Sequence, residues 1–179
     1  MPLVADMSSM ILSKPVDVTK YGCIYFGVQK NVAPAGMAIA IVRDDLLGHA
    51  ADNVPTMMNY TTLLGKDSMY NTPPCWCIYI LGLVLQWLES LGGLAEMEKI
   101  NAEKAAILYH YLDESKLFRG AAQPAARSRM NVTFRTADPA LDAQFAKEAA
   151  AAGLSNLKGH RLVGGMRASI YNAMPVEGV

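Results

Sequence analysis

The sequence has no excess of either charge sign. Its 16 basic residues balance 16 acidic ones in a chain of 179, and no basic run is longer than two residues. A neutral chain without basic runs gives no electrostatic reason to bind nucleic acid or an anionic membrane. We therefore expect neither kind of partner.

The sequence also lacks an apolar run long enough to cross a membrane. The longest run, Pro74 to Leu88, is shorter than the about 20 residues that a span needs and contains Gln86. It predicts a buried helix instead. No basic start followed by an apolar run is present at the N-terminus, so no signal peptide is predicted.

Cysteine is scarce and its number is odd. Cys23, Cys75 and Cys77 suit a reducing compartment with free thiols, which favours a cytoplasmic location. The spacing of Cys75 and Cys77 is compatible with a metal site. Because no other cysteine and no nearby histidine complete a ligand set, two buried thiols on an apolar helix are the favoured interpretation.

What the sequence does have is a set of continuous apolar runs. They predict strands at residues 3–7, 23–28 and 37–42. Strands of this kind need cover on both faces, which indicates an α/β fold. Residues 50–70 predict an extended loop, and Thr72 is expected to cap a helix that ends at Ser90.

The remainder has the pattern of a small α+β domain that follows a long helix. The predicted elements are a helix at 94–112, a strand at 128–134, a helix at 139–152 and strands at 154–158 and 166–171. The sequence opens on a strand with nothing before it and closes where a helix is about to begin. We therefore expect a piece of a longer protein.

Two polar residues follow apolar strands and are candidates for chemistry. Lys30 ends the second strand, where lost solvation lowers the pKa of an amine and suits it to Schiff-base formation. Asp6 ends the first strand, where a carboxylate can keep a pyridinium nitrogen protonated. Taken alone, each has a commoner explanation: a solvated surface lysine and an Asx turn cap.

Two further groups are candidates for binding anions. Asn71 and Thr72 precede a helix, where side chains and free amides can hold a phosphate, although simple capping is commoner. His160, Arg161 and Arg167 lie among glycines in one short segment. Because guanidinium groups bind carboxylate and phosphate in a bidentate way, this segment suits a small dianionic substrate.

Seven strings, read in order, closely resemble the phosphoserine aminotransferase family of class V aminotransferases. The resemblance covers essentially the whole chain, and the last two strings are specific to that family. The strings are Ala5-Asp6-Met7-Ser8-Ser9, Tyr25-Phe26-Gly27-Val28-Gln29-Lys30-Asn31, Asn71-Thr72-Pro73-Pro74, Arg127-Ser128-Arg129-Met130-Asn131-Val132, Lys158-Gly159-His160-Arg161, Gly164-Gly165-Met166-Arg167-Ala168-Ser169 and Tyr171-Asn172-Ala173.

The resemblance implies a type I fold dependent on pyridoxal 5'-phosphate (PLP), working as a homodimer. Residues 1–95 would be the second part of the large PLP domain, and 96–179 most of a small C-terminal α+β domain. The implied reaction moves an amino group between L-glutamate and 3-phosphohydroxypyruvate, giving O-phospho-L-serine and 2-oxoglutarate in serine biosynthesis. Family members are about twice this length, and Phe26 and Val28 stand where they have smaller residues.

The resemblance also assigns roles to the candidate residues. Lys30 would bind the cofactor covalently, Gln29 would help hold its phosphate, and Asp6 would contact its ring nitrogen. The Asn71-Thr72 pair would reach the phosphate of the partner subunit's cofactor. The implied substrate residues are His160 and Arg161 for the distal phosphate and Arg167 for the α-carboxylate.

Two rival interpretations stay open at this point. One is another class V enzyme of the alanine–glyoxylate type, whose substrate has no phosphate; the His160-Arg161 pair argues against it. The other is a truncated, non-catalytic chain that binds at most a partner subunit. The two interrupted ends favour this second rival.

Overall fold

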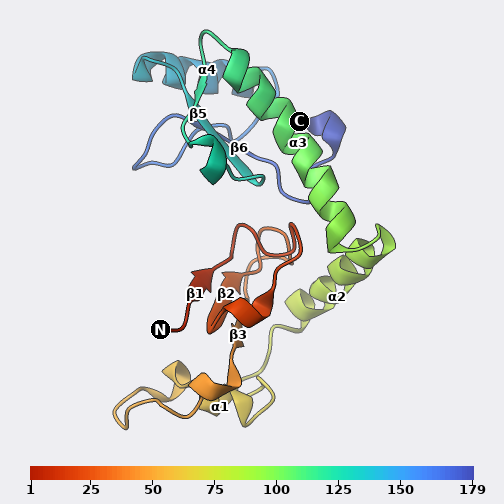
Figure 1. Cartoon of the computed structure of the whole chain (residues 1–179), viewed down its shortest axis with the longest axis vertical. Coiled ribbons are helices and arrows are strands. Elements are labelled where there is room, and N and C mark those ends of the chain that lie inside the picture. Colours follow the sequence, from red (N-terminus) through yellow and green to blue (C-terminus); the bar gives the residue numbers. More distant parts are fainter. The chain divides into compact units, whose positions relative to one another are not determined.

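The chain divides into two compact units. The computed structural model describes residues 1–179, and its units are Met1–Ser90 and Leu91–Val179. Figure 1 draws the first unit in red to yellow-green and the second in green to blue. Each unit has its own three-stranded sheet, so the mixed helix and strand content predicted from the sequence is confirmed.

The sheet of the first unit contains the three predicted strands. These are β1 (Val4–Asp6), β2 (Cys23–Gly27) and β3 (Ala38–Val42), in the order β1-β2-β3. β1 pairs with β2 in parallel, and β3 is antiparallel to β2. The ends of β1 and β2 that deliver Asp6 and the Gln29-Lys30 segment therefore lie at the same edge of the sheet.

One face of this sheet is buried and the other is not. Ile24 and Phe26 pack into a core with Val28, Val32 and neighbouring apolar residues. The opposite face, which includes Tyr25, is largely exposed, with Tyr25 at 44%. The expectation that both faces are covered is therefore met only in part within this chain, because Cys23 on the second face is buried but Tyr25 is not.

Two helices follow in the first unit. The first was not predicted, and the second begins later than predicted. α1 (Tyr60–Leu64) lies inside the predicted loop, with the Asn59 side chain accepting a hydrogen bond from the Thr61 amide at 3.0 Å. α2 (Cys75–Ser90) begins three residues after Thr72, so Thr72 is not its cap. The two prolines explain the delay, because a residue before proline is pushed toward extended backbone.

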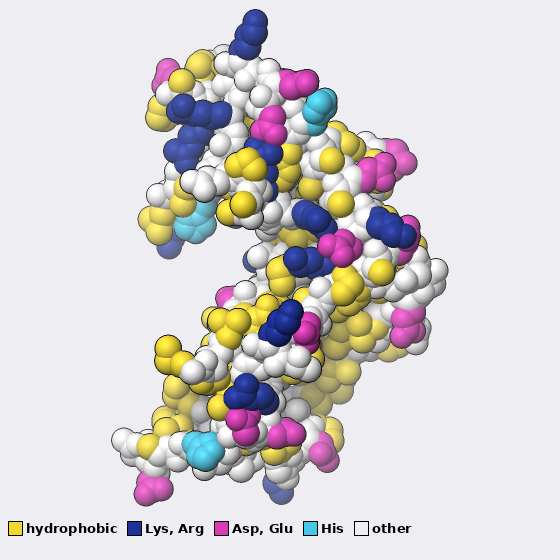
Figure 2. Space-filling model, in the orientation of Figure 1, with side chains coloured by type: hydrophobic (Ala, Val, Ile, Leu, Met, Phe, Trp, Pro, Cys, Tyr) yellow, Lys and Arg dark blue, Asp and Glu magenta, His cyan; other side chains and the backbone are white.

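The predicted burial of α2 is also wrong for most of its length. Only Cys77 and Leu88 of this helix are buried, whereas Trp76, Tyr79 and Trp87 are exposed. Hydrophobic side chains accordingly gather on the surface of the first unit in Figure 2. The apolar run predicted the helix correctly, but within this chain only one side of it has a core to pack against.

The second unit places a long helix against an antiparallel sheet. Val132 and Ile170 of the sheet pack on Ala105, Tyr109 and Leu112 of the helix. The elements are α3 (Leu94–Glu114), β4 (Arg119–Gly120), β5 (Asn131–Arg135), α4 (Pro139–Ala151) and β6 (Met166–Ser169), with the strand order β4-β5-β6. No single helix of the chain is long and apolar enough to cross a membrane; α2 and α3 reach that length and composition only together, across a break.

The predicted helices and two of the predicted strands of this unit are confirmed, but one strand is wrong. Residues 154–158 form no strand, and only Lys158 makes an isolated bridge, to Met166. The third strand is β4, whose two residues are too few to leave a sequence pattern. Short 3-10 helices complete the chain at Val18–Lys20, Asp44–Leu46, Thr56–Met58, Pro124–Ala126 and Val176–Gly178.

A buried lysine fastens α3 to the segment that follows β6. The side chain of Lys104 is fully buried, and its Nζ donates to the carbonyl oxygens of Ile170 (3.2 Å), Tyr171 (2.9 Å) and Met174 (3.0 Å). Burial lowers the pKa of Lys104 below its ordinary value. The three donors of the ammonium group match three backbone acceptors that no strand partner satisfies.

We expect Lys104→Met to destabilise the second unit by about 2–4 kcal/mol. The change keeps the volume but leaves the carbonyls of Ile170 and Met174 without this donor, at about 1–3 kcal/mol each, offset in part by the lost burial of a charge. The Tyr171 carbonyl keeps a bond from the Met174 amide. Urea unfolding and amide hydrogen exchange of residues 166–174 measure this loss. Lys99→Met is the control on the same helix, because Lys99 is an exposed residue paired with Glu96. Equal stability of the two variants would show that the contacts of Lys104 contribute nothing.

Candidate functional site

Asp6 is held in place by Ser8 at the end of β1. Its Oδ1 accepts hydrogen bonds from the Ser8 amide (2.8 Å) and from the Ser8 Oγ (2.6 Å). The same Oγ accepts from the Gly27 amide at the end of β2, at 3.0 Å. Ser8 therefore ties the carboxylate of one strand to the backbone of the next.

The carboxylate of Asp6 is kept ionised by these contacts. The Ser8 hydroxyl is the largest cause that lowers the pKa of Asp6, followed by the Ser8 amide, and the charge of Lys30 adds a smaller lowering. Desolvation opposes them without reversing the direction. The structure thus places Asp6 and Lys30 near enough for the charge of the lysine to act on the carboxylate, although no ion pair joins them.

Lys30 lies in a turn that is anchored on both sides. The Val32 and Ala33 amides donate to the Val28 carbonyl oxygen at 3.1 and 2.9 Å, and the two valines are buried. The Asn31 side chain donates to the carbonyl oxygen of Ile11 at 3.0 Å. These bonds to the Val28 and Ile11 carbonyl oxygens hold the backbone of the turn, while the side chain of Lys30 is exposed. The expected burial of this lysine is therefore not supplied by the residues of this chain.

Gln29 folds back over the end of β2. A Cβ atom added to Gly27 would lie 2.5 Å from the Gln29 Oε1 and 3.1 Å from its Nε2. The absence of a side chain at residue 27 thus gives the amide group room to lie against the backbone. Gln29 is exposed beside Lys30, so both side chains leave the same turn toward solvent.

Asn71 and Thr72 stand apart from this cluster. Both are exposed in the segment before α2, and the Asn71 Nδ2 donates a weak hydrogen bond to the Met57 Sδ at 3.6 Å. No hydrogen bond or ion pair joins either residue to Asp6 or Lys30. The two side chains are free to meet a group from outside the chain.

His160 and Arg161 are carried on a tight loop in the second unit. The Gly159 amide donates to the Gly165 carbonyl oxygen at 2.9 Å, and the Gly164 amide donates to the His160 carbonyl oxygen at 2.8 Å. A Cβ atom on Gly159 would lie 2.6 Å from the Gly165 carbonyl oxygen, so only glycine fits there. Both functional side chains are exposed on this loop.

Arg167 lies on β6 and has an unmet hydrogen-bonding group. It stands opposite Thr133 of β5, and its Nε is buried without an acceptor. A buried guanidinium N–H without a partner is costly, and a bound anion would remove that cost. Arg167 therefore fits a carboxylate or phosphate better than it fits a purely structural role.

Ser8 is the site residue that sequence reasoning missed. Its string Asp6-Met7-Ser8 carried a signal, because aspartate commonly accepts from the backbone two residues later. That signal predicts the contact with Asp6 but not the bond from Gly27, which depends on the pairing of β1 with β2.

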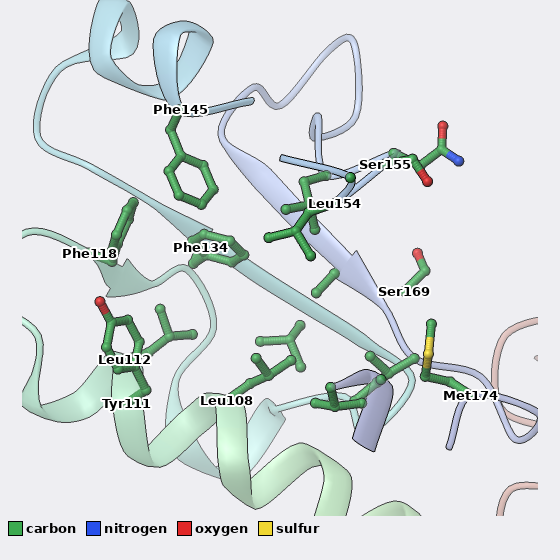
Figure 3. Close-up of a pocket in the computed structure, with 18 residues that line it drawn as sticks. Leu108, Tyr111, Leu112, Phe118, Phe134, Phe145, Leu154, Ser155, Ser169 and Met174 are labelled. Carbon is green, nitrogen blue, oxygen red and sulfur yellow. The ribbon is translucent and has the colours of Figure 1, made fainter. Parts of the chain in front are cut away.

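The second unit also contains an apolar cavity of about 560 Å³. Figure 3 shows Phe118, Phe134, Phe145 and Leu108 pointing into it from the sheet and helices. No charged side chain lines it, and none of the predicted site residues does. It belongs to the hydrophobic side of the sheet, whereas Arg167 lies on the other side.

Comparison with known proteins gives a family match over the full chain. The family model described as "Aminotransferase class-V" matches residues 1–179. A phosphoserine aminotransferase from Bacillus circulans subsp. alkalophilus is 45% identical with a TM-score of 0.95, over 99% of this chain and 50% of that one. The PLP-bound phosphoserine aminotransferase from Trichomonas vaginalis is 40% identical with a TM-score of 0.92, over 99% and 51%.

Other solved structures widen this comparison. A phosphoserine aminotransferase studied for radiation damage of its Schiff base is 49% identical with a TM-score of 0.93, over 99% of this chain and 49% of that one. An alanine–glyoxylate aminotransferase from Nostoc sp. is 16% identical with a TM-score of 0.77, which shows a shared fold alone. The chain spans about half the length of the structures it matches.

We expect Ser8→Ala to raise the pKa of Asp6 toward its ordinary value. The hydroxyl bond is the largest cause of the lowered pKa, so its removal weakens the ionised form. A carbon-13 NMR titration of the Asp6 carboxyl group measures the shift. Thr19→Ala is the matched control, since the Thr19 hydroxyl bonds Asp17 in the same way (2.6 Å); it should move the pKa of Asp17 and leave that of Asp6. An unchanged pKa of Asp6 in Ser8→Ala would contradict the conclusion that the Ser8 hydroxyl lowers it.

Proposed function

Because the chain belongs to the class V aminotransferase family, we propose that it carries the cofactor lysine and the substrate residues of a PLP-dependent phosphoserine aminotransferase. The reaction moves an amino group between L-glutamate and 3-phosphohydroxypyruvate, giving O-phospho-L-serine and 2-oxoglutarate. The identities of 40–49% to phosphoserine aminotransferases support this substrate class. Because the chain spans about half of those structures, the activity belongs to the assembled enzyme in which these residues meet.

The observation that carries the proposal is that Lys30 and an ionised Asp6 follow two paired parallel strands at the same end of one sheet. Both stand at the same edge of a sheet, one fixed by a turn and the other by Ser8. PLP, when bound, supplies an electron sink for the amino-acid carbon that loses its proton. The amine of Lys30 would bind the cofactor covalently, and the carboxylate of Asp6 would hold a proton on its ring nitrogen.

The freed amine of Lys30 then moves the proton. An amine on an anchored turn would serve first as base and then as acid toward the amino-acid carbon. The neighbouring Gln29 fits the cofactor phosphate as an amide donor. The residues present therefore match the needs of the cofactor.

The remaining roles belong to groups that bind anions. Arg167, with its unpaired Nε, holds the α-carboxylate common to both substrates. His160 and Arg161 bind the distal group, and the glycine loop lets a ligand approach their backbone closely. Asn71 and Thr72, which are exposed and unattached to Lys30, serve the cofactor phosphate of a partner subunit. A homodimer in the cytoplasm, working in serine biosynthesis, is part of this proposal.

Lys30→Ala should abolish the borohydride-reducible link between the chain and PLP. With about one equivalent of PLP, peptide mass spectrometry after reduction should find the label on Lys30 in the unmodified chain, because its amine lies at the same end of the sheet as the Asp6 carboxylate. Lys20→Ala is the control, since Lys20 is an exposed lysine of the same unit. Undiminished labelling of Lys30→Ala, or labelling spread evenly over other lysines, would refute the role of Lys30.

Arg161→Ala and Arg167→Ala should separate the two ends of the substrate. Loss of one partner from a charge-assisted pair in a closed site costs about 2–5 kcal/mol. Arg167→Ala should weaken the glutamate and phosphohydroxypyruvate half-reactions equally. Arg161→Ala should weaken the second by about tenfold more, or about 1.4 kcal/mol, since phosphate carries more charge than carboxylate. Stopped-flow half-reactions of the assembled enzyme measure both; equal losses in Arg161→Ala point to a substrate without phosphate.

A further inference from the structure

The arginines of the second unit fall into two groups. Arg127 and Arg129 each form an ion pair with a carboxylate on α3. Arg119, Arg135, Arg161 and Arg167 form no ion pair with any aspartate or glutamate, and all of these but the loop residue Arg161 lie on strands of the sheet. The charge of this second group is therefore not neutralised within the chain.

The unpaired arginines on strands share one face of the sheet. Arg119 of β4 stands directly opposite Arg135 of β5, and Thr133 of β5 stands opposite Arg167 of β6. Side chains alternate along a strand, so residues 133 and 135 point to the same side. The hydrophobic core of the unit occupies the other side. In Figure 2, dark blue Lys and Arg side chains gather at the upper left, over this unit.

The Arg119–Arg135 pair is unfavourable without a ligand. Residues directly opposite on antiparallel strands have Cβ atoms about 4.5–5.5 Å apart, and like charges there repel. Arg135 is half-buried, which reduces screening on its side, whereas Arg119 is exposed, so water relieves part of the repulsion. The neighbouring Arg167 has a buried Nε without an acceptor, so the same face shows a second unmet need for an anion.

We propose that the cross-strand pair Arg119–Arg135 binds a phosphate dianion beside Arg167. Two guanidinium groups carry two positive charges, which a phosphate with between one and two negative charges and three acceptor oxygens balances better than a carboxylate with a single charge. The loop that carries Arg161 comes close to this pair, because a Cβ on Gly165 would lie 3.4 Å from the Arg135 Cβ. The site goes beyond the proposed function, which uses neither Arg119 nor Arg135.

Titration of the PLP-free chain with inorganic phosphate tests the site. At constant ionic strength, calorimetry should show saturable binding. Arg119→Gln and Arg135→Gln should each weaken it by about tenfold, or about 1.4 kcal/mol. The matched control is Arg129→Gln, an arginine of the same unit that already has a carboxylate partner, and it should change the dissociation constant by less than about twofold. Absence of saturable binding, or equal losses in all three variants, overturns the proposal.

Thermal unfolding separates binding from a structural role. In phosphate-free buffer, Arg135→Gln should unfold no earlier than the unmodified chain, because it removes a repulsion. Phosphate should raise the unfolding temperature of the unmodified chain more than that of Arg135→Gln. A variant that is destabilised equally with and without phosphate, and that binds phosphate normally, shows that Arg135 is only structural.

A second arm with O-phosphoserine identifies the source of the phosphate. Weaker binding of both ligands to Arg135→Gln shows that the site accepts a phosphate group on an organic molecule as well as the free ion, and weaker binding of inorganic phosphate alone shows that it accepts only the free ion; either result supports the site. Labelling of Lys30 by PLP is measured separately. Phosphate binding without labelling of Lys30 defeats the proposed function alone, and labelling without phosphate binding defeats this inference alone.

Discussion

Parallel pairing of β1 with β2 is the constraint on which the cofactor end of the site depends. Parallel strands bring their carboxyl ends to one edge, and this brings Asp6 and Lys30 together across 23 intervening residues. Ser8 then converts a shared edge into a fixed geometry, since one hydroxyl accepts from β2 and donates to the carboxylate. The position of Asp6 relative to Lys30 thus depends on the parallel pairing of β1 with β2, and not on either side chain alone.

The sequence predicted the elements well where the pattern was local. Continuous apolar runs gave β1, β2 and β3, and the amphipathic pattern from Pro139 gave α4. Local reasoning failed at Thr72, where two prolines delay the helix, and at residues 154–158, which meet β6 only through an isolated bridge at Lys158 and form no strand. The predicted burial of α2 was wrong because the apolar pattern of a helix shows which side is hydrophobic but not which other elements cover that side.

The sequence predicted which residues belong to the candidate site, but it did not predict the contacts that these residues make. Asp6, Lys30 and Arg167 were each suggested by their strings, but the bond from Gly27 to Ser8 and the unmet Nε of Arg167 depend on register between strands. Opposed arginines on β4 and β5 were invisible for the same reason. Two residues of β4 leave no periodic signal, so their partner could be found only in three dimensions.

The contacts of Lys104 also set an order for folding during synthesis. Its nearest acceptor in sequence, the Ile170 carbonyl, is 66 residues further along the chain, and its farthest, that of Met174, is 70. A ribosome that makes about 5–20 residues per second therefore needs several seconds to produce the acceptors after it has made the donor. During that time α3 can form, but its ammonium stays in water. The second unit cannot close until synthesis has passed Met174, whatever the first unit has done.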